Sequence, residues 1–256
     1  MHLLEARGLV KQFGHRLVVD GVDFHVNSGE VVGLLGANGA GKTTSFRMAT
    51  GLITPNAGQV FFAGTDITRW PMYRRARLGM GYLSQETSVF RKLTVEQNLL
   101  AILETISVPK GQSARQFRRA EAHYLLEQFG LIHLKDNLAI TLSGGEKRRL
   151  EIARCLVTEP ALILLDEPFT GIDPKTIADI KHIVRELRTA GIGVLLTDHN
   201  VIETLKITDR AYVIFEGKVI AHGVPRVIVK HPDVKRLYLG DNHDAERLLD
   251  DHSVAA

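Results

Sequence analysis

Two stretches of the chain have the residue types and spacing of anion-binding sites. The first, GANGAGKT (residues 36–43), satisfies the pattern G-x-x-x-x-G-K-[ST]. Its glycines let consecutive backbone N–H groups turn toward a phosphate, and its lysine and hydroxyl can reach further phosphate oxygens and Mg²⁺. An apolar run (residues 31–36) typical of a buried strand leads into it, and a helix is expected from about Lys42 to Thr50. This stretch therefore predicts a phosphate-binding loop.

The second stretch, LSGGE (residues 142–146), stands directly before a charged helix. Ser143 and Glu146 have the spacing of a capping box. Gly144 and Gly145 should leave the first-turn N–H groups open to an anion at the helix N-terminus. Because a helical segment precedes this stretch, we expect it to lie away from the chain's own phosphate loop and to close on the nucleotide of a second copy. An N-capped helix without a ligand is the alternative.

Further polar side chains stand just past other predicted strands, where ligands bind in open parallel sheets. Asp166 ends the apolar run LILL and is placed to hold Mg²⁺ through water, and Glu167 follows as the candidate base that polarises the attacking water. Gln85 follows GYL and has an amide for the metal or the water. His199 follows VLLTD and could hydrogen-bond a γ-phosphate oxygen. Taken alone, Gln85 could equally be a surface residue and His199 a structural one.

The composition is that of an ordinary soluble globular protein. The chain has 256 residues, is 45% hydrophobic and 24% charged, and has a formal net charge of +3. This balance is too mild to indicate a nucleic-acid partner. A single cysteine, Cys155, excludes an internal disulfide and a cysteine metal cluster. We expect neither a signal peptide nor a membrane span, because the chain contains no suitable apolar run.

Hydrophobic patterning predicts an α/β fold in which buried strands follow helices, as in βαβ units with a parallel sheet. We expect one domain over residues 1–240 with a helical subdomain at about 90–140, and a mobile acidic tail over 241–256. Thr94 and Gln97 should cap the first helix of the subdomain. The predicted strands lie within residues 1–27 (two strands), 31–36, 59–64, 79–83, 161–166, 192–198 and 211–223 (a hairpin turning at Glu216 and Gly217).

The order of GANGAGKT, Gln85, LSGGE, LILLDEP, GID (residues 171–173) and His199 resembles that of the ATP-binding subunits of ABC transporters. The likeness covers roughly residues 3–240, and LSGGE is highly specific when a phosphate loop accompanies it. It implies a P-loop NTPase core with a mainly parallel sheet, an antiparallel β subdomain and a helical insertion subdomain. It further implies hydrolysis of ATP to ADP and phosphate, with Mg²⁺. The active form would be a head-to-tail homodimer with two ATP molecules between the copies.

The resemblance assigns a role to each matching position. Glu167 and His199 would be catalytic. The residues contacting ATP in the same copy would be Phe13, Gly36, Asn38, Gly39, Ala40, Gly41, Lys42, Thr43, Thr44, Gln85 and Asp166. Those serving the metal would be Thr43, Gln85 and Asp166. The contacts from the second subunit would be Ser143, Gly144, Gly145, Glu146 and Asp173.

A few positions depart from the family pattern. Phe13 stands where tyrosine is commoner, so stacking on adenine is kept and a hydroxyl is lost. Ala37 and Ser84 replace prolines, and Thr170 replaces a small alanine. These departures weaken none of the catalytic assignments.

A closer resemblance is to the ATPase subunits of lipopolysaccharide-export ABC transporters, carried by GYLSQETSVFRKLTVEQNL, LTDHNVIETL, AYVIFEGKVIAHG and VKRLYLG. It implies a peripheral position on the cytoplasmic side of the inner membrane and two polytopic permease subunits as partners. Phe90 and Arg91 match the groove where those partners dock, although an apolar Val89–Phe90 pair inside the fold is an alternative. The ATPase subunits of branched-chain amino acid importers are the alternative family.

Two other functional classes remain open. Soluble ABC proteins that act on DNA or ribosomes usually have two cassettes or a long coiled-coil insertion, and this sequence shows neither. A phosphate-loop kinase would need an acceptor pocket in place of LSGGE and would not need a dimer.

Overall fold

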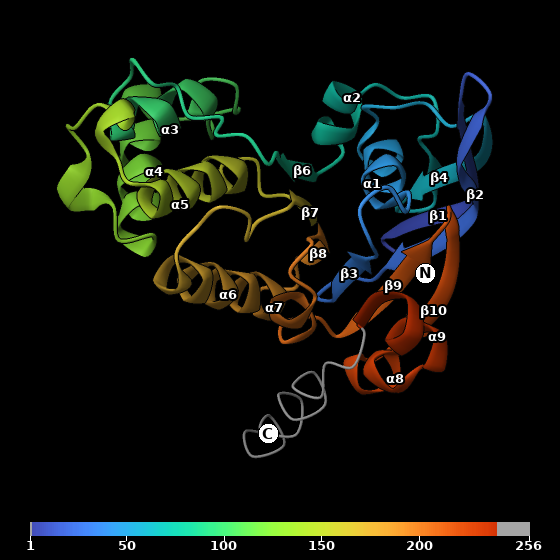
Figure 1. Cartoon of the computed structure of the whole chain (residues 1–256). Coiled ribbons are helices and arrows are strands. Elements are labelled where there is room, and N and C mark those ends of the chain that lie inside the picture. The colour runs from blue at the N-terminus through green and yellow to red at the C-terminus, as the bar shows by residue number, and fades with distance from the viewer. Residues whose placement is uncertain (1, 240–256) are drawn as a thin grey trace.

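The computed structural model describes residues 2–239 and contains two β-sheets and a helical lobe (Figure 1). The predicted mobile tail, residues 241–256, lies outside the described residues. The strands are β1 (Leu4–Phe13), β2 (Arg16–Val26), β3 (Val31–Leu35), β4 (Ala57–Phe62), β5 (Thr65–Asp66), β6 (Met80–Leu83), β7 (Leu162–Asp166), β8 (Gly193–Thr197), β9 (Arg210–Phe215) and β10 (Lys218–Gly223).

The helices flank these sheets and also build the separate lobe. They are α1 (Lys42–Thr50), α2 (Met72–Arg77), α3 (Val95–Leu103), α4 (Ala114–Gln128), α5 (Gly144–Leu156), α6 (Pro174–Thr189), α7 (Val201–Leu205), α8 (Pro225–Lys230) and α9 (Pro232–Val234). Short turns of other helix types are η1 (Ile132–Leu134), η2 (Ala139–Thr141) and η3 (Lys235–Leu239).

The larger sheet has the strand order β10-β9-β3-β8-β7-β6 and is parallel except for the β9–β10 hairpin. Every residue of β3, β7 and β8 is buried, which explains why these strands read as unbroken apolar runs. The hairpin turns at Glu216 and Gly217, both at positive φ (47° and 78°), as a two-residue hairpin requires. The predicted parallel core and its hairpin are confirmed.

The smaller sheet is antiparallel, with the order β2-β1-β4-β5. Its apolar face, together with α1, packs against one face of the larger sheet, and Phe24, Phe46, Val60 and Leu164 belong to one buried cluster. The antiparallel sheet therefore packs on the side of the larger sheet that also carries α1, the helix that follows the phosphate loop.

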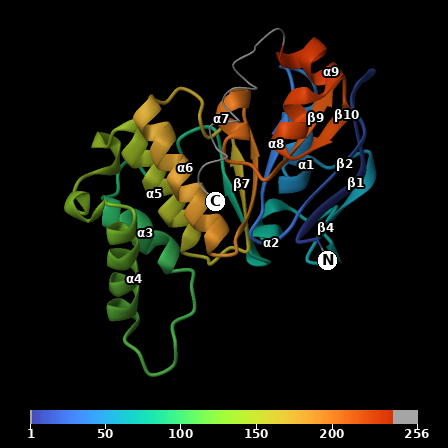
Figure 2. The ribbon, with the colours of Figure 1, turned by 90° about the horizontal axis from the view of Figure 1, so that it is seen from below.

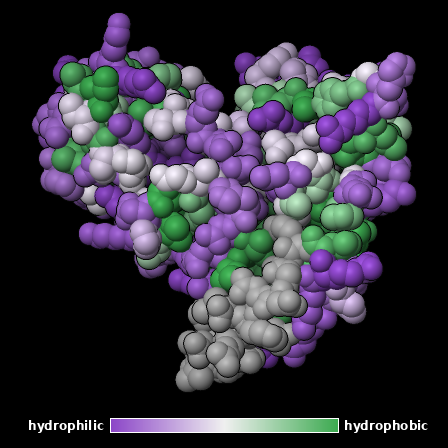
Figure 3. Space-filling view, in the orientation of Figure 1, coloured by the Kyte–Doolittle hydropathy of each residue, from purple (hydrophilic) through white to green (hydrophobic). Residues whose placement is uncertain are grey.

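The helical lobe begins at the predicted capping box and contains the helix that the spacing of residues 114–129 predicts. Helix α3 starts after Thr94, with Gln97 completing the box, and ends at Leu103, and α4 spans Ala114–Gln128. One buried cluster joins α3 and α4 with α5, α6 and the neighbouring sheet strands. Figures 1 and 2 show these helices on the side of the molecule away from α1 and the antiparallel sheet, and the space-filling view shows a notch between the two lobes (Figure 3). The helix carrying the second anion-binding stretch thus belongs to the lobe's core.

The buried side chain of Arg75 in α2 has a structural role that the sequence patterns do not predict. It is 1% exposed, and its guanidinium donates to the carbonyl oxygens of Met48, Ala49, Trp70 and Thr68 at 2.6–3.2 Å. Met48 and Ala49 lie in the last turn of α1, where carbonyl groups lack helical partners. Burial lowers the pKa of Arg75 to about 10. This side chain therefore fastens α2 to the end of the helix that follows the phosphate loop.

Candidate functional site

The chemically active side chains predicted from the sequence stand at one edge of the parallel sheet. The register pairs Leu34 of β3 with Thr197 of β8, and Thr197 with Asp166 of β7. Strand β6 lies beside β7, with Leu83 paired to Leu165. The carboxyl ends of these four strands therefore present the phosphate loop, His199, the Asp166–Glu167 pair and Gln85 side by side, as the sequence predicts.

The phosphate loop has a backbone that only glycine adopts readily at its two ends. Gly36 and Gly41 have φ of 148° and 104°, and Gly39 has φ of 79°. A Cβ on Gly41 would lie 2.7 Å from the carbonyl oxygen of Val18, and a Cβ on Gly36 would collide with that of Ile214. The conformation and the lack of space both require glycine at Gly36 and Gly41.

The tip of the β9–β10 hairpin supports this loop from behind. The Gly217 N–H donates to the Ala40 carbonyl at 2.9 Å, and the Gly217 carbonyl accepts from the Asp20 N–H at 2.8 Å. Two backbone hydrogen bonds therefore connect the phosphate loop, the hairpin and β2. This support fixes the loop in place without using its inward-facing N–H groups.

The environment of the Lys42 ammonium suits an anionic ligand. The residue is 4% exposed, and its Nζ atom has one protein hydrogen bond among the described residues, to the Ala37 carbonyl at 3.2 Å. Burial lowers the pKa of Lys42, and the carboxylates of Glu167 and Asp198 partly oppose that shift. A buried ammonium with two unused donors fits a phosphate that would accept from them.

Asp166 provides a buried carboxylate beside the loop. It is 3% exposed, its Oδ2 accepts from the Tyr82 hydroxyl at 3.3 Å, and burial raises the pKa of the carboxyl. Burial and the neighbouring Asp166 carboxylate also raise the pKa of Tyr82 to about 12. Thr43 and Thr44, in the first turn of α1, are half-buried. A carboxylate, hydroxyls and the Gln85 amide oxygen form a donor set that suits Mg²⁺.

Glu167 is held through a single carboxylate oxygen. Its Oε2 accepts from the Gln85 amide at 3.0 Å and from the Thr170 hydroxyl at 3.1 Å. No described residue donates to Oε1. The backbone of Glu167 is in the left-handed region, with φ of 47°, and its N–H donates to the Thr197 carbonyl at 2.8 Å. Among the described residues, one oxygen is thus fixed by the protein and the other has no donor, an arrangement that is compatible with the predicted role as a base.

Asp198 aligns the loops that follow β7 and β8. This fully buried carboxylate accepts from the Phe169 N–H and from the Asn200 N–H, both at 2.8 Å. Burial raises the pKa of Asp198. Phe169 lies between Glu167 and Thr170 in the loop after β7, and Asn200 follows His199 in the loop after β8. By binding both backbone N–H groups, Asp198 holds the two loops together. The sequence places Asp198 at this edge but does not reveal that it links the two loops.

The LSGGE stretch forms the predicted capping box. The Ser143 hydroxyl accepts from the Glu146 N–H at 3.3 Å, and the Ser143 N–H donates to Glu146 Oε2 at 2.7 Å. That backbone hydrogen bond from Ser143 lowers the pKa of Glu146. The two glycines differ, however: a Cβ on Gly144 would meet open space, whereas one on Gly145 would lie 2.7 Å from the Thr176 hydroxyl. The Cβ side of Gly145 is therefore packed against Thr176 of α6, and the opening of the first-turn N–H groups to an anion stays a prediction.

Asp173 belongs to the same surface through Thr176. Its side chain caps α6 by accepting from the Lys175 and Thr176 N–H groups, and it accepts from the Thr176 hydroxyl at 2.7 Å. The hydroxyl of Thr176 thus stands between Asp173 and Gly145. These residues, predicted to serve a second subunit, are neighbours within one copy.

The two anion-binding stretches lie apart in one copy. Figures 1 and 2 place α5 and α1 in opposite lobes, and no described hydrogen bond or ion pair joins residues 36–44 to residues 143–146.

Comparison with known proteins decides the family. The family model described as ABC transporter matches residues 19–170, which is more than half of the chain. The chain belongs to the ABC transporter family. As an ATP-binding cassette of that family, it is an ATPase.

Relatives match this cassette over nearly its whole length. An uncharacterized ABC transporter ATP-binding protein of Rhizobium meliloti (strain 1021) is 55% identical over 239 residues, which are 93% of this chain and 87% of that protein. The lipopolysaccharide export system ATP-binding protein LptB of Escherichia coli (strain K12) is 50% identical over 242 residues, 94% of this chain and 99% of that protein. The protein of the same name from Haemophilus influenzae is 51% identical over 241 residues, 94% and 98% of the two chains.

The fold is also that of solved ABC cassettes. The crystal structure of the ADP conformation of MJ1267, an ATP-binding cassette of an ABC transporter, superposes with a TM-score of 0.82 at 32% identity. The match covers 94% of this chain and 100% of that one. The predicted ABC ATPase fold, with its parallel core, antiparallel subdomain and helical subdomain, is confirmed.

Phe13 is an exposed aromatic residue at the end of β1. It is the last residue of β1, it pairs with Arg16 across the turn, and it is 49% exposed. The Arg16 guanidinium lies 4.0 Å from the position a Cβ would take on Gly39. The Lys11 ammonium stands 5.3 Å from the Phe13 ring centroid. An exposed ring agrees with a base-stacking role, which stays a prediction.

Val89 and Phe90 have opposite environments in this cassette. Val89 is 6% exposed and belongs to the helical core, whereas Phe90 is 41% exposed and its ring lies 4.2 Å below the Arg154 guanidinium. Two hydrogen bonds with the Asn98 side chain fix the Phe90 backbone. Arg91 beside it is exposed. The alternative of a fully buried apolar pair therefore holds for Val89 alone.

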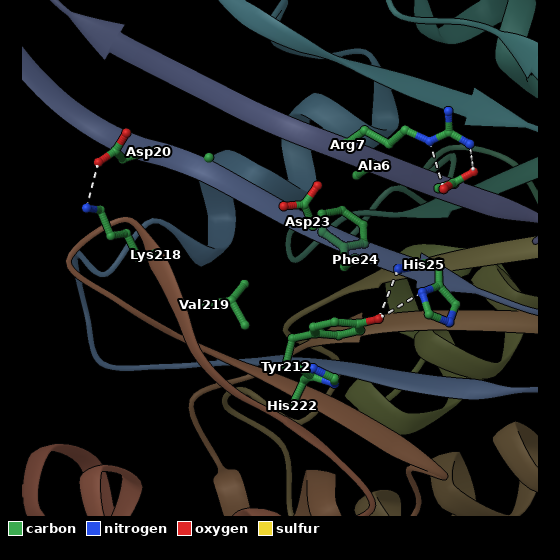
Figure 4. Close-up of a pocket in the computed structure, with 12 residues that line it drawn as sticks. Ala6, Arg7, Asp20, Asp23, Phe24, His25, Tyr212, Lys218, Val219 and His222 are labelled. Carbon is green, nitrogen blue, oxygen red and sulfur yellow. Dashed lines mark hydrogen bonds and ion pairs between the residues drawn. The ribbon is translucent and has the colours of Figure 1, made fainter.

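A separate cavity lies between the antiparallel sheet and the β9–β10 hairpin. It measures about 710 Å³ and is lined by β1, β2, β9 and β10. Figure 4 shows His25, Tyr212 and His222 on one side of it and Asp20, bound to Lys218, on another. None of the predicted nucleotide-contacting residues lines this cavity. No helix within residues 2–239 is long and apolar enough to cross a membrane.

Proposed function

We propose that this ATPase powers lipopolysaccharide extraction from the inner membrane and export toward the outer membrane. The observation that carries the proposal is the 50% identity over 94% of the chain to a protein named for lipopolysaccharide export, which it matches over 99% of that protein's length. The Haemophilus influenzae relative carries the same name. The ATPase subunit of a branched-chain amino acid importer, the alternative from the sequence, is not favoured.

We further propose that two copies of the chain share each ATP. The phosphate loop and Lys42 of one copy would hold the triphosphate, and the Ser143–Glu146 stretch of the other copy would close on it. The separation of these two sites between the lobes of one chain supports this arrangement. Gly144 supports it as well, since the space beside it is open to a ligand. Asp173 would contribute at the seam, because Thr176 connects it to Gly145.

The residues at the sheet edge would divide the hydrolytic work. Glu167 would accept a proton from the attacking water at its free Oε1, while Gln85 and Thr170 hold Oε2. Mg²⁺, held by Thr43, Gln85 and Asp166, would neutralise charge on the phosphate oxygens. His199 would contact the γ-phosphate. Phe13 would stack on adenine, and the loop residues Gly36, Asn38, Gly39, Ala40 and Gly41, with Thr44, would surround the phosphates.

The partners we propose are a second copy of this chain and two polytopic permease subunits, which would hold the cassette on the cytoplasmic side of the inner membrane. Phe90 and Arg91 would line the permease-docking groove. The segment carrying them is fastened to α5 by Glu151, which accepts from Ser88, and by Arg154, which donates to the Ser88 carbonyl at 2.7 Å. Closure of the Ser143 end on a nucleotide would therefore be transmitted to this segment through α5.

Depletion in the native host tests the cargo. We expect lipopolysaccharide to accumulate at the inner membrane while branched-chain amino acid uptake continues, and the wild-type gene, but not the Glu167→Gln form, to restore export. Unchanged lipopolysaccharide transport with failed amino acid uptake would instead support the importer. Purification from membranes should recover polytopic partners, whereas recovery of nucleic acid would indicate a soluble ABC protein of another class.

A further inference from the structure

The imidazole of His199 is surrounded by oxygen atoms on one side of its ring. Its Nδ1 lies 3.2 Å from the Thr170 hydroxyl, 3.6 Å from Asp198 Oδ1 and 3.7 Å from Glu167 Oε2. Of these three, the hydroxyl alone is within hydrogen-bond distance. The position of its proton therefore decides which nitrogen of His199 carries hydrogen.

The Thr170 hydroxyl has one proton, which it donates in a hydrogen bond to Glu167. Because a carboxylate can only accept, the 3.1 Å contact with Glu167 Oε2 requires Thr170 to donate. The hydroxyl oxygen can then only accept from the imidazole, so His199 must donate from Nδ1. The bonds run in one direction, from Nδ1–H to the hydroxyl and from the hydroxyl to the carboxylate.

We infer that Thr170 is a positioning residue that fixes Nδ1 of His199 as a hydrogen-bond donor and joins the imidazole to Glu167. This inference rests on the proposed function, because it deepens the role of the same site. The hydroxyl supplies one of the two hydrogen bonds that fix Glu167 Oε2, and Gln85 supplies the other. In the neutral Nδ1–H form, Nε2 offers a lone pair and no proton. His199 could then donate to a γ-phosphate oxygen only after Nε2 gains a proton.

The hydrogen-bonded link between His199 and Glu167 depends on the hydroxyl of Thr170, which family members with alanine at this position lack. With alanine, both carboxylates would remain at least 3.6 Å from Nδ1, which is too far for a direct hydrogen bond. Thr170 is half-buried, and its replacement by valine keeps the shape while removing the hydroxyl. Replacement by serine keeps the hydroxyl. The pair of variants therefore separates the hydrogen bonds from packing.

Nitrogen-15 NMR of histidine-labelled full-length protein tests the inference without nucleotide. The His199 signals are assigned from their loss in a His199→Asn variant, at about pH 8.5 so that unperturbed imidazoles are neutral. We expect the Nδ1–H form in the wild type and in Thr170→Ser, and a raised Nε2–H population in Thr170→Val. An Nε2–H imidazole in the wild type, or identical spectra for the valine and wild-type proteins, would overturn the inference.

Steady-state ATP hydrolysis by the same variants gives the second measurement. Loss of a hydrogen bond to the charged Glu167 should lower kcat about tenfold in Thr170→Val, with KM for ATP nearly unchanged and activity restored in Thr170→Ser. A valine variant with wild-type kcat would contradict the positioning role. A wild-type protein that hydrolyses no ATP would contradict the proposed function instead, and the NMR result would stand independently of it.

Discussion

The amide of Gln85 lies 3.0 Å from Glu167 Oε2, although 82 positions separate the two residues in the chain. The contact connects the exits of the adjacent strands β6 and β7. Since Gln85 begins the segment that leads to Phe90, the carboxylate proposed as the base is directly joined to the segment proposed to meet the permeases. Nucleotide chemistry and partner docking can thus influence each other through this bond.

Replacing Glu167 with glutamine should separate ATP binding from hydrolysis. The amide keeps the shape of the side chain but cannot take a proton from water, so we expect turnover to fall by roughly 10²–10⁴ while ATP binding persists. ATP should then trap a dimer that is detectable by size-exclusion chromatography. Glu127→Gln, on the exposed face of α4, is the matched control. Wild-type turnover in the Glu167 variant would remove the assignment of the base.

Ser143 and Thr94 allow capping to be separated from ligand contact. Each forms a complete capping box, at the start of α5 and of α3 respectively. Replacing either with alanine should cost about 1 kcal/mol of unfolding free energy in urea titrations. Only Ser143→Ala should also weaken ATP-induced dimerisation, because Thr94 is not proposed to meet nucleotide. Equal effects of both variants on dimerisation would argue against a ligand at the α5 terminus.

Arg75 is expected to be one of the most sensitive positions for stability. Arg75→Met keeps much of the buried volume but removes the side-chain donor from four carbonyl groups, of which that of Met48 still accepts from the Gly51 N–H. Because buried unsatisfied groups are costly, we expect a loss of roughly 3–5 kcal/mol in the free energy of unfolding. Arg77→Met, at an exposed position of the same helix, should be nearly neutral. A neutral Arg75→Met variant would show that α2 is fastened in some other way.

His25 should make the protein less stable in mild acid. Burial lowers its pKa below the ordinary 6.5, and the nearby Arg210 guanidinium lowers it further, with Glu30 opposing. Below pH 6.5 the unfolded chain therefore binds more protons than the folded one, and stability falls as the pH falls. The stability difference between wild type and His25→Gln should accordingly shrink from pH 7.5 to 5.5 in urea unfolding.

A variant at the exposed His15 controls for the loss of an imidazole from the chain. A stability difference that stays constant or grows as the pH falls would contradict the assignment for His25. The result bears also on the cavity in Figure 4, since His25 lines it and its Nδ1 lies 3.1 Å from the Tyr212 hydroxyl.

The sequence predicts those parts of the molecule that depend on local patterns. Buried strands such as β3 and β7 have unbroken apolar runs, and glycines mark the phosphate loop, so the sheet edge and its residues can be placed in advance. The capping boxes at Thr94 and Ser143 are equally local. The resemblance to a known family adds the order of the motifs, which periodicity alone does not provide.

Other features arise only when distant segments meet. Arg75 reads as one of several arginines in a basic helix, and its burial depends on the end of α1. Thr170 reads as a modest departure from a family alanine, and its link to His199 needs the loops after β7 and β8 to be adjacent. Gly145 reads like Gly144 until α6 packs against it. In each case tertiary packing decides the role.

The most direct test of the shared nucleotide mixes two inactive variants. Lys42→Met removes the ammonium of the phosphate loop. Gly144→Asp places a negative charge at the N-terminus of α5, where it would repel a phosphate. The helix itself should tolerate this residue, because the side chain has space there and negative charge is favourable at a helix N-terminus. In a mixed dimer, one site would contain both defects and the other would contain neither.

Each variant alone should therefore be inactive as an ATPase, and an equimolar mixture should regain about one quarter of wild-type activity, because half of the dimers are mixed and each has one intact site. Control mixtures of either variant with itself should stay inactive. A mixture no more active than its components would contradict the account, because it would mean that each ATP is bound and hydrolysed within a single copy.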